Sequence, residues 1–423
     1  MSKETLQNWK GTVAVMGVDW GDSGKGRLVD DLASRADVVA RYNGGSNTGH
    51  TVKNYAGEFA LHIIPSGIFS ENATCLIGRN VAVDLESLAT EMDQLNAVGI
   101  NCNNLIIDEQ SSLTMPWHKM LDGNSRENAK IGTTGKGVGP TYADRTARRG
   151  LLVKDLFAQD FANKVQNEAN FYVKHFDLNL NQADIISQYK KYAKAIEKFI
   201  GNTISILRKA LVAKQNILFE GAQGYFLDID AGTYPFVTSS NPGTVGIWRC
   251  FDLHPSNLSQ IIGITKSYMT RVGEGPMPTI IDGKEAEIII EKGKEVGTTT
   301  GRIRRPGWLD LVLIEEAVKV NGITSLAITK LDILSHIKKI KVCVGYKIDG
   351  QKVGYISHDA DFIARVQPVY EELEGWQTDI TQASNFDELP KQAKVFIRFI
   401  EKKVKVPVKF IGVGPRREQA IYV

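Results

Sequence analysis

Short runs of β-branched and other apolar residues alternate along the chain with segments whose apolar residues recur at helical spacing. The runs predict strands at 12–17, 37–42, 104–109, 216–220, 260–268, 325–330, 341–346 and 408–414. The helical spacing predicts helices at 28–35, 84–99 and 310–322. This alternation favours an α/β fold with a mostly parallel central sheet and helices on both of its faces.

A further stretch, 181–213, carries isoleucines, tyrosines and leucines at helical spacing and predicts a helical insertion or hairpin. The length of 423 residues allows two or three domains, or one elaborated α/β domain. The sequence contains no internal repeat, low-complexity tract or obvious linker. We therefore expect one domain spanning residues 1–423.

Composition narrows the class of protein. Hydrophobic residues make up 43% and charged residues 23% of the chain, as in ordinary globular proteins, and the net charge of +3 gives no reason to expect a nucleic-acid or membrane partner. The 4 cysteines are far apart and form no CxxC pair, so neither a zinc site nor a disulfide framework is indicated. The N-terminus is polar and no apolar run approaches the roughly 18 residues of a membrane span. We expect a cytoplasmic protein.

The first strand is followed by a glycine-bracketed lysine, Gly24-Lys25-Gly26, at the predicted start of a helix. Backbone N–H groups and an ammonium at such a junction can hold a phosphate, although a plain glycine turn has the same pattern. Gly26 stands where the usual phosphate loop has Ser or Thr, which disfavours an ordinary P-loop GTPase. Asp22 beside it could hold magnesium, act as a base or cap the helix.

Other predicted loops contain candidate chemistry of the same kind. His50 follows a glycine-rich loop and could exchange a proton near neutral pH, or lie on the surface without a role. The segments 131–150 and 297–308 combine hydroxyl groups with arginines that suit phosphates or a dicarboxylate, or form a solvated basic face. The tetrapeptide TKLD at 329–332 is similar to the guanine-reading element of GTP-binding proteins.

The order and spacing of these motifs resemble the adenylosuccinate synthetase family from Val13 to about Arg417. The motifs are WGDSGKG, GGSNTGHT, IGTTGKGVGPTY, ARRG, FEGAQG, TYPFVTSSN, TRVGEGP, TTGRIRRPGWLD, TKLD and GVGP. The resemblance implies a P-loop-like nucleotide-binding architecture and a ligase of purine biosynthesis that forms a C–N bond. In this family GTP phosphorylates the 6-oxygen of IMP, and the amino group of L-aspartate then displaces phosphate to give adenylosuccinate and GDP.

The resemblance also implies roles for residues. Asp22 corresponds to the catalytic base and ligand of one Mg²⁺ ion, Gly49 to the backbone carbonyl that helps to hold this ion, and His50 to the general acid. Lys25 and Gln223 complete the catalytic set. Arg148 corresponds to an arginine that reaches into the neighbouring subunit's site, which implies a homodimer.

Three binding sites follow from the same resemblance. The nucleotide monophosphate (IMP) site comprises Asp22, Ser23, Gly24, Lys25, Asn47, Thr48, Gly49, His50, Thr134, Arg148, Gln223, Thr238 and Arg302. The GTP site comprises Gly21, Asp22, Ser23, Gly24, Lys25, Gly26, Arg27, Gly49, His50, Thr51, Arg304, Lys330, Leu331, Asp332, Gly412, Val413 and Gly414. The aspartate site comprises Thr298, Thr299, Thr300, Gly301, Arg302, Ile303 and Arg304.

The sequence departs from the family pattern around the purine. Ser23 stands where the family has Glu, Asp19 where Gln is usual and Ser46 where His is common. Ile303 interrupts an arginine run, Gly412 replaces a serine, and 242–251 is bulky where the family has small residues. Loss of a carboxylate at 23 could alter the purine preference towards GMP or dGMP, or be neutral. A non-catalytic GTP-binding paralogue is a further alternative, against which Asp22, His50, Gln223 and Arg302 argue.

Overall fold

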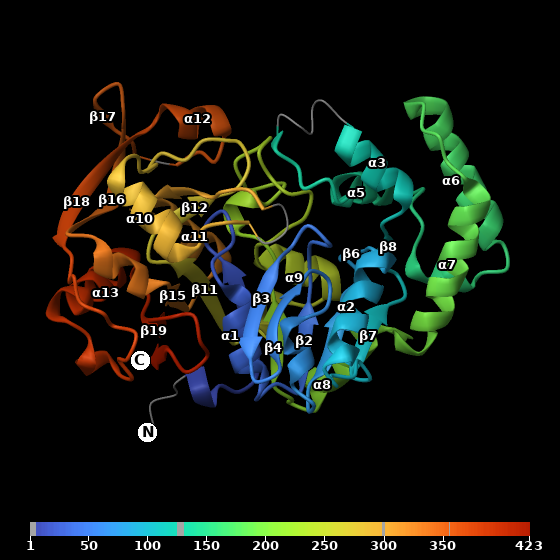
Figure 1. The fold of residues 1–423 in the computed structure, drawn as a ribbon, viewed down its shortest axis with the longest axis horizontal. Helices are drawn as coiled ribbons and strands as arrows, with labels where there is room; N and C mark the ends of the chain where they lie inside the picture. Colours follow the sequence, from blue (N-terminus) through green and yellow to red (C-terminus); the bar gives the residue numbers. More distant parts are fainter. Residues whose placement is uncertain (1–5, 125–130, 298–300, 355) are drawn as a thin grey trace.

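The computed structural model describes residues 6–124, 131–297, 301–354 and 356–423. A ten-stranded sheet crosses the molecule (Figure 1). In spatial order its strands are β20 (Ala420–Tyr422), β19 (Val408–Gly412), β15 (Ser325–Thr329), β11 (Gln260–Lys266), β1 (Thr12–Gly17), β10 (Ile217–Glu220), β2 (Val38–Arg41), β5 (Thr74–Ile77), β7 (Leu105–Asp108) and β9 (Ile200–Gly201). Pairing is parallel from β19 to β9 and antiparallel between β19 and β20.

The two faces of the sheet build two hydrophobic cores. Alternate residues of β1 divide between them: Val13 and Val15 point to one core, Ala14 and Met16 to the other. The first core is covered by α1 (Lys25–Ala33), α2 (Leu85–Ala97), α3 (Pro116–Asn124), α6 (Phe161–Phe176) and α7 (Gln182–Ile196). The second is covered by α8 (Thr203–Val212), α9 (Thr244–Phe251), α10 (Lys284–Gly293), α11 (Leu311–Asn321) and α13 (Lys391–Val404). The predicted α/β class with helices on both faces is confirmed.

Most predicted strands belong to this sheet, and one does not. The run at 341–346 lies in β16 (Lys339–Ile348), which forms a separate small sheet with β14 (Leu309–Asp310), β17 (Gln351–Lys352) and β18 (Gln367–Glu374). The sequence analysis missed β5 and the hairpin of β3 (His50–Asn54) and β4 (Gly57–Leu61). The apolar run of β5, TCLI, is only 4 residues long, and β3, HTVKN, is mostly polar.

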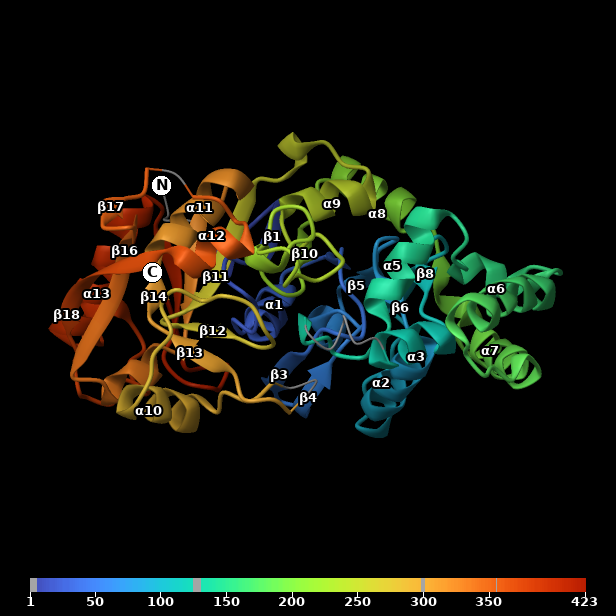
Figure 2. The same cartoon turned by 90° about the horizontal axis from the view of Figure 1, so that it is seen from above.

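The segment 181–213 is helical but is not one insertion. Helices α7 and α8 are separated by β9, which pairs with β7 at the edge of the central sheet. Helix α7 packs against α6, and the two lie side by side at one end of the molecule in both views (Figures 1 and 2). The predicted extent of the hairpin was therefore wrong, because the partner of α7 precedes it in the chain.

The central sheet connects the two ends of the chain: β1, near the N-terminus, is next to β11, and β19 and β20 lie near the C-terminus. This continuity supports our proposal that the chain forms a single domain. Within the described residues, no helix is both long and apolar enough to cross a membrane.

Close backbone approaches bring two loops together beyond the carboxyl ends of β1 and β10. A Cβ atom at Gly17 would lie 2.6 Å from the carbonyl oxygen of Gln223, and one at Gly224 would lie 2.2 Å from that of Asp19. Both distances are shorter than real Cβ contacts, so glycine is required at each position. The loops that contain the candidate residues therefore meet at this edge of the sheet, where open α/β sheets bind ligands.

Candidate functional site

A cavity of about 1030 Å³ opens at this edge of the sheet. Most of the predicted site residues line it: Gly21, Asp22, Ser23, Gly24, Lys25, Gly26, Arg27, Asn47, Thr48, Gly49, His50, Thr51, Thr134, Gln223, Thr238, Arg302, Arg304, Lys330, Asp332 and Gly414. Of the predicted residues that the structure describes, Arg148, Gly301, Ile303, Leu331, Gly412 and Val413 lie outside this lining. Thr298, Thr299 and Thr300 fall outside the described residues. One cavity thus collects segments that are far apart in the sequence.

The start of α1 is shaped to receive an anion. Gly24, the N-cap residue, has a left-handed φ of 85°, and no side chain among the described residues caps the first turn. The N–H groups of that turn and the helix dipole are thereby available to a ligand phosphate. Lys25 begins the helix; burial lowers the pKa of its ammonium, against the attraction of Asp19, Asp22 and Glu220. The positive charge at this point is therefore poorly hydrated, which strengthens its interaction with an anion.

Asp22 lies beside this anion site in a left-handed conformation with φ 56°. Its Oδ2 accepts from Nε of Arg304 at 2.8 Å. Burial raises the pKa of Asp22, but Arg304 and Lys266 outweigh it and hold the pKa below its usual value. Asp22 is therefore an ionised carboxylate at neutral pH.

The donors near Asp22 fit a magnesium ion only together with a ligand. Asp22 and the main chain of Gly49 both line the cavity, and carboxylate and carbonyl oxygens are donors that Mg²⁺ accepts. Within the described residues, no group of three or more His, Cys, Asp or Glu side chains could hold a metal. An ion at Asp22 and Gly49 would take its remaining ligands from nucleotide phosphates and water, which is how Mg²⁺ commonly binds at phosphate sites.

His50 is held by a carboxylate that the sequence analysis did not single out. Its Nδ1 lies 2.5 Å from Oε1 of Glu220, at the end of β10. Burial lowers the pKa of His50, while the pKa of Glu220 is also lowered because the His50 contact and Arg41 outweigh its burial. The pair is therefore a neutral imidazole that donates Nδ1–H to an ionised carboxylate. Nε2 of His50 is buried without a hydrogen-bond partner in the described part of the chain.

Glu220 is itself fixed from a second direction. Ser66 donates its hydroxyl to Oε1 at 2.7 Å and its backbone N–H to Oε2 at 2.8 Å. Both Ser66 and Glu220 are fully buried. A glutamate that ends a buried apolar strand, as in ILFE at 217–220, is the sequence signal that could have identified this residue.

A polar cluster forms another wall of the cavity. Nε2 of Gln223 donates to Oδ1 of Asn47 at 3.0 Å and to the hydroxyl of Thr48 at 3.1 Å. Nδ2 of Asn47 donates in turn to the hydroxyl of Thr238 at 3.3 Å. The predicted IMP-binding residues of three separate loops are thus connected to one another by hydrogen bonds.

The guanine-like motif is linked to the anion site. Thr329 ends β15 and donates its hydroxyl to the carbonyl of Ser23 at 2.8 Å. Lys330 follows in a left-handed conformation and donates to the carbonyl of Gly293 at 2.6 Å and to Glu295 at 2.7 Å. Asp332 lines the same cavity, and burial raises the pKa of its carboxyl. A single ligand that contacts both Gly24 and Asp332 would span the anion site at the start of α1 and the guanine-like motif.

A carboxyl group lies next to Ser23. Its hydroxyl donates to Asp19, whose two oxygens lie 2.7 and 2.8 Å away. Both side chains are fully buried, and burial raises the pKa of Asp19 although Lys25 and Ser23 oppose the shift. A carboxyl group, that of Asp19, thus lies one hydrogen bond away from position 23. The Ser23 hydroxyl points to Asp19.

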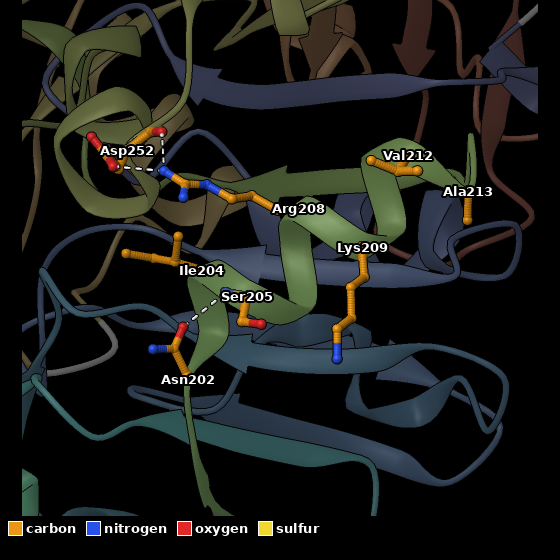
Figure 3. Close-up of a pocket in the computed structure, with 8 residues that line it drawn as sticks. All are labelled: Asn202, Ile204, Ser205, Arg208, Lys209, Val212, Ala213 and Asp252. Carbon is orange, nitrogen blue, oxygen red and sulfur yellow. Dashed lines mark hydrogen bonds and ion pairs between the residues drawn. The ribbon is translucent and has the colours of Figure 1, made fainter.

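A second depression lies on the outer side of α8 (Figure 3). It is lined by Asn202, Ile204, Ser205, Arg208, Lys209, Val212, Ala213 and Asp252. The ion pair drawn there joins Arg208 and Asp252 at 2.7 Å, and both side chains are more than half exposed. Such pairs contribute little free energy and indicate no chemistry, so the cavity at the sheet edge is the candidate site.

Comparisons with known proteins identify the family. A model of the adenylosuccinate synthetase family matches residues 14–421. The adenylosuccinate synthetase of Halothermothrix orenii is 44% identical over 424 residues, covering 97% of this chain and 98% of that protein. The fully ligated adenylosuccinate synthetase of Plasmodium falciparum has a TM-score of 0.93 at 33% identity, covering 97% of this chain and 99% of the other.

One solved structure with a different nucleotide shares the fold. The succinoaminodeoxyadenylate synthetase of cyanophage S-2L, bound to dGMP and to dATP as energy donor, has a TM-score of 0.63 at 17% identity. The match covers 98% of this chain and 95% of that one. At this identity the likeness concerns the fold alone.

The Ser23–Asp19 hydrogen bond predicts a pH-dependent loss of stability in Ser23→Ala. A hydrogen bond to an ionised carboxylate contributes about 1.5–3 kcal/mol, so urea unfolding of the variant should show a loss of this size at pH values above the pKa of Asp19. Because Ser23 stabilises the ionised form, the variant raises the pKa of Asp19 further. The loss should therefore grow as pH rises through that pKa.

Ser325→Ala is the matched control. Ser325 is also fully buried, but its hydroxyl has no hydrogen-bond partner in the described part of the chain. Its removal should leave the free energy of unfolding unchanged or increase it. Equal losses in the two variants, or a loss in Ser23→Ala that does not vary with pH, would contradict this account of Ser23.

Proposed function

The chain belongs to the adenylosuccinate synthetase family, and from this premise we propose which of its residues carry out each step of the reaction. The protein is a ligase that uses GTP and Mg²⁺ to join L-aspartate to IMP. Curated relatives at 44% and 43% identity over 97% of this chain are named adenylosuccinate synthetase, which supports IMP over GMP or dGMP and an enzyme over a GTP sensor.

In the first step, Asp22 accepts the N1 proton of IMP. Its lowered pKa keeps the carboxylate ionised, so it can act as base while the 6-oxygen attacks the γ-phosphorus of GTP. The bond from that phosphorus to the bridging oxygen breaks and GDP leaves. The ammonium of Lys25 and the N–H groups at the start of α1 hold the transferring phosphoryl group. Mg²⁺, when bound at Asp22 and Gly49, supplies neutralisation of the developing phosphate charge.

His50 is the proposed general acid at the 6-oxygen. The observation that carries the proposal is its buried Nε2, which has no hydrogen-bond partner in the described part of the chain, on a residue that lines the cavity. Nε2 first takes up a proton from solvent, and the Glu220 carboxylate at Nδ1 stabilises the resulting imidazolium and keeps its orientation. Because burial lowers the pKa of His50, this imidazolium readily gives up its proton.

In the second step, the amino nitrogen of aspartate forms a bond to C6 while the C6–oxygen bond breaks and phosphate leaves. Arg302 and Arg304 are the proposed partners of the aspartate carboxylates, since guanidinium groups bind carboxylates bidentately. Arg302 also donates to the carbonyl of Gly132 at 2.9 Å, which connects the predicted aspartate loop to the loop of Thr134.

Phosphate release from GTP tests the substrate assignment. With IMP and L-aspartate the protein should release phosphate, and with GMP or dGMP in place of IMP the rate should fall at least tenfold. Omission of aspartate should abolish turnover in each case. Preference for GMP or dGMP would contradict the IMP assignment, and absence of aspartate-dependent release would contradict the assignment as an enzyme.

Glu220→Gln tests the role of the His50 partner. The amide retains the shape of the side chain but cannot stabilise an imidazolium, so kcat should fall by about 10²-fold with little change in the KM for GTP. Ser66→Ala removes one hydrogen bond from the same carboxylate without changing its charge, and should lower kcat by less than about fivefold. If the two substitutions lower kcat equally, Glu220 does not assist His50 electrostatically.

We also propose a homodimer in which Arg148 completes the neighbouring subunit's IMP site. Arg148 ends α5 (Val138–Ala147) in a left-handed conformation, is exposed, and does not line the cavity of its own chain.

The four cysteines are free and buried, which supports a cytoplasmic location.

Arg148→Ala should raise the KM for IMP by at least tenfold and leave the KM for GTP within about twofold, because one charge-assisted contact to phosphate is lost. Sedimentation velocity of the wild type should show a dimer at the assay concentration. A monomer with full activity, or an unchanged KM for IMP in the variant, would contradict the shared site.

A further inference from the structure

One buried carboxylate outside the predicted site connects two parts of it. Glu295 follows α10 and is fully buried. Its Oε1 accepts from Nζ of Lys330 at 2.7 Å and from the hydroxyl of Tyr268 at 2.5 Å. Its Oε2 accepts from Nη1 of Arg304 at 2.9 Å and from Nζ of Lys266 at 3.2 Å. Three cations thus share one anion.

The three cations of this cluster outnumber the one carboxylate that they share. Lys266, Lys330 and Arg304 outweigh burial and hold the pKa of Glu295 well below its usual range, so its carboxylate is ionised. Burial lowers the pKa of Lys266 to about 8. Two of the cations, Lys330 and Arg304, line the cavity, whereas Glu295 lies outside its lining. Glu295 therefore supports cationic groups that face a ligand without facing it itself.

Arg304 is a bridge between two carboxylates. Its Nε donates to Oδ2 of Asp22 at 2.8 Å while its Nη1 donates to Glu295. The side chain of Arg304 is 8% exposed, so both ion pairs lie in a poorly hydrated environment where charge interactions are strong. The proposed base thus shares its counter-ion with Glu295.

The main chain reinforces the same connection. The N–H of Arg304 donates to the carbonyl of Glu295 at 2.9 Å, and Val296 and Ile303 form an antiparallel bridge next to it. The N–H of Gly297 donates to the carbonyl of Arg302 at 2.7 Å. Glu295 and Arg304 are therefore opposite each other at the base of the loop that presents the two arginines.

We propose that Glu295 is a positioning residue that couples the guanine subsite at Lys330 to the phosphoryl-transfer centre at Asp22. One carboxylate oxygen holds Lys330 and the other holds Arg304, so the position of each cation changes the electrostatic energy of the other. The identity of the ligand as GTP rests on the proposed function, and the coupling rests on the contacts of Glu295.

The coupling has a direction. When a guanine nucleotide binds Lys330 in the position where Glu295 holds it, Lys330 neutralises less of the Glu295 charge, and the carboxylate attracts Arg304 more strongly. Arg304 then shifts from Asp22 towards Glu295, and the Asp22 carboxylate becomes accessible for the N1 proton. By reciprocity, displacement of Arg304 from Asp22 by other ligands strengthens nucleotide binding.

Binding of guanosine 5′-(β,γ-imido)triphosphate, measured by calorimetry, tests the positioning role without requiring turnover. Glu295→Gln should weaken binding at least tenfold, because it removes the charge that fixes both cations. Tyr268→Phe is the matched control: it removes a neutral donor from the same carboxylate, and should weaken binding less than threefold. Binding of IMP and the thermal unfolding temperature report on the fold of each variant.

A double-mutant cycle tests the coupling itself. In the wild-type background, Lys330→Met and Arg304→Lys should be non-additive, with the double variant differing by at least fivefold from the product of the single effects. In the Glu295→Gln background, the effect of the double variant on binding should equal the product of the two single effects within about twofold. If Glu295→Gln does not fold, Glu295→Gln with Lys266→Met removes the buried cation left without its partner and serves as the background instead.

The outcomes distinguish a failure of the proposed use of GTP from a failure of the proposed role of Glu295. A wild-type protein that does not bind the analogue contradicts the proposed use of GTP. A wild-type protein that binds it, with unchanged affinity in the Glu295 variant or with additive effects in the wild-type background, overturns the role of Glu295. Weakened binding together with loss of non-additivity in the Glu295 background supports it.

Discussion

The need to neutralise charge in a poorly hydrated interior governs this structure. Buried ionisable groups gather at this edge of the sheet: Lys25 and Arg304 line the cavity, whereas Asp19, Glu220, Lys266 and Glu295 lie outside its lining. An unpaired charge at this depth would cost several kcal/mol, so each group must lie within reach of a charge or a hydrogen-bond partner supplied by another segment of the chain. The parallel sheet meets this need, because the carboxyl ends of its central strands converge and place acidic and basic side chains from distant segments side by side.

The need to neutralise buried charge also accounts for which residue acts as the acid and which acts as the base. A histidine that donates to a buried carboxylate keeps one orientation, as His50 does beside Glu220, and its Nε2 has no hydrogen-bond partner within the described residues. An aspartate paired with a guanidinium stays ionised, as Asp22 does beside Arg304. The acid and the base of the reaction thus obtain their protonation states from their neighbours, in the way that acid–base pairs of other enzymes do.

The sequence predicted well what depends on local patterns. Buried parallel strands are continuous apolar runs, so β1 was predicted at its observed bounds, 12–17. The sequence placed Gly24 at the start of a helix, where it is the N-cap of α1, and most of the described residues named from the motif resemblance line one cavity. The segment 181–213 is largely helical as predicted, but helical spacing did not reveal that α7 packs against the preceding α6.

Long-range partners could not be read from the sequence. Glu220 reaches a histidine 170 positions away and Arg304 an aspartate 282 positions away, and no local pattern encodes either pair. The substitution at Ser23 shows the same limit. Taken alone it left two alternatives open, an altered purine preference or a neutral change, and only the structure shows that the Ser23 hydroxyl donates to the carboxyl group of Asp19.

The central claim is that the 6-oxygen of IMP becomes phosphorylated before aspartate displaces it. The most direct measurement follows that oxygen: the protein is supplied with IMP labelled with ¹⁸O at position 6, together with GTP, Mg²⁺ and L-aspartate, and the released phosphate is analysed by mass spectrometry. The account predicts one ¹⁸O atom in each phosphate released. Phosphate without ¹⁸O, formed alongside adenylosuccinate, would contradict it.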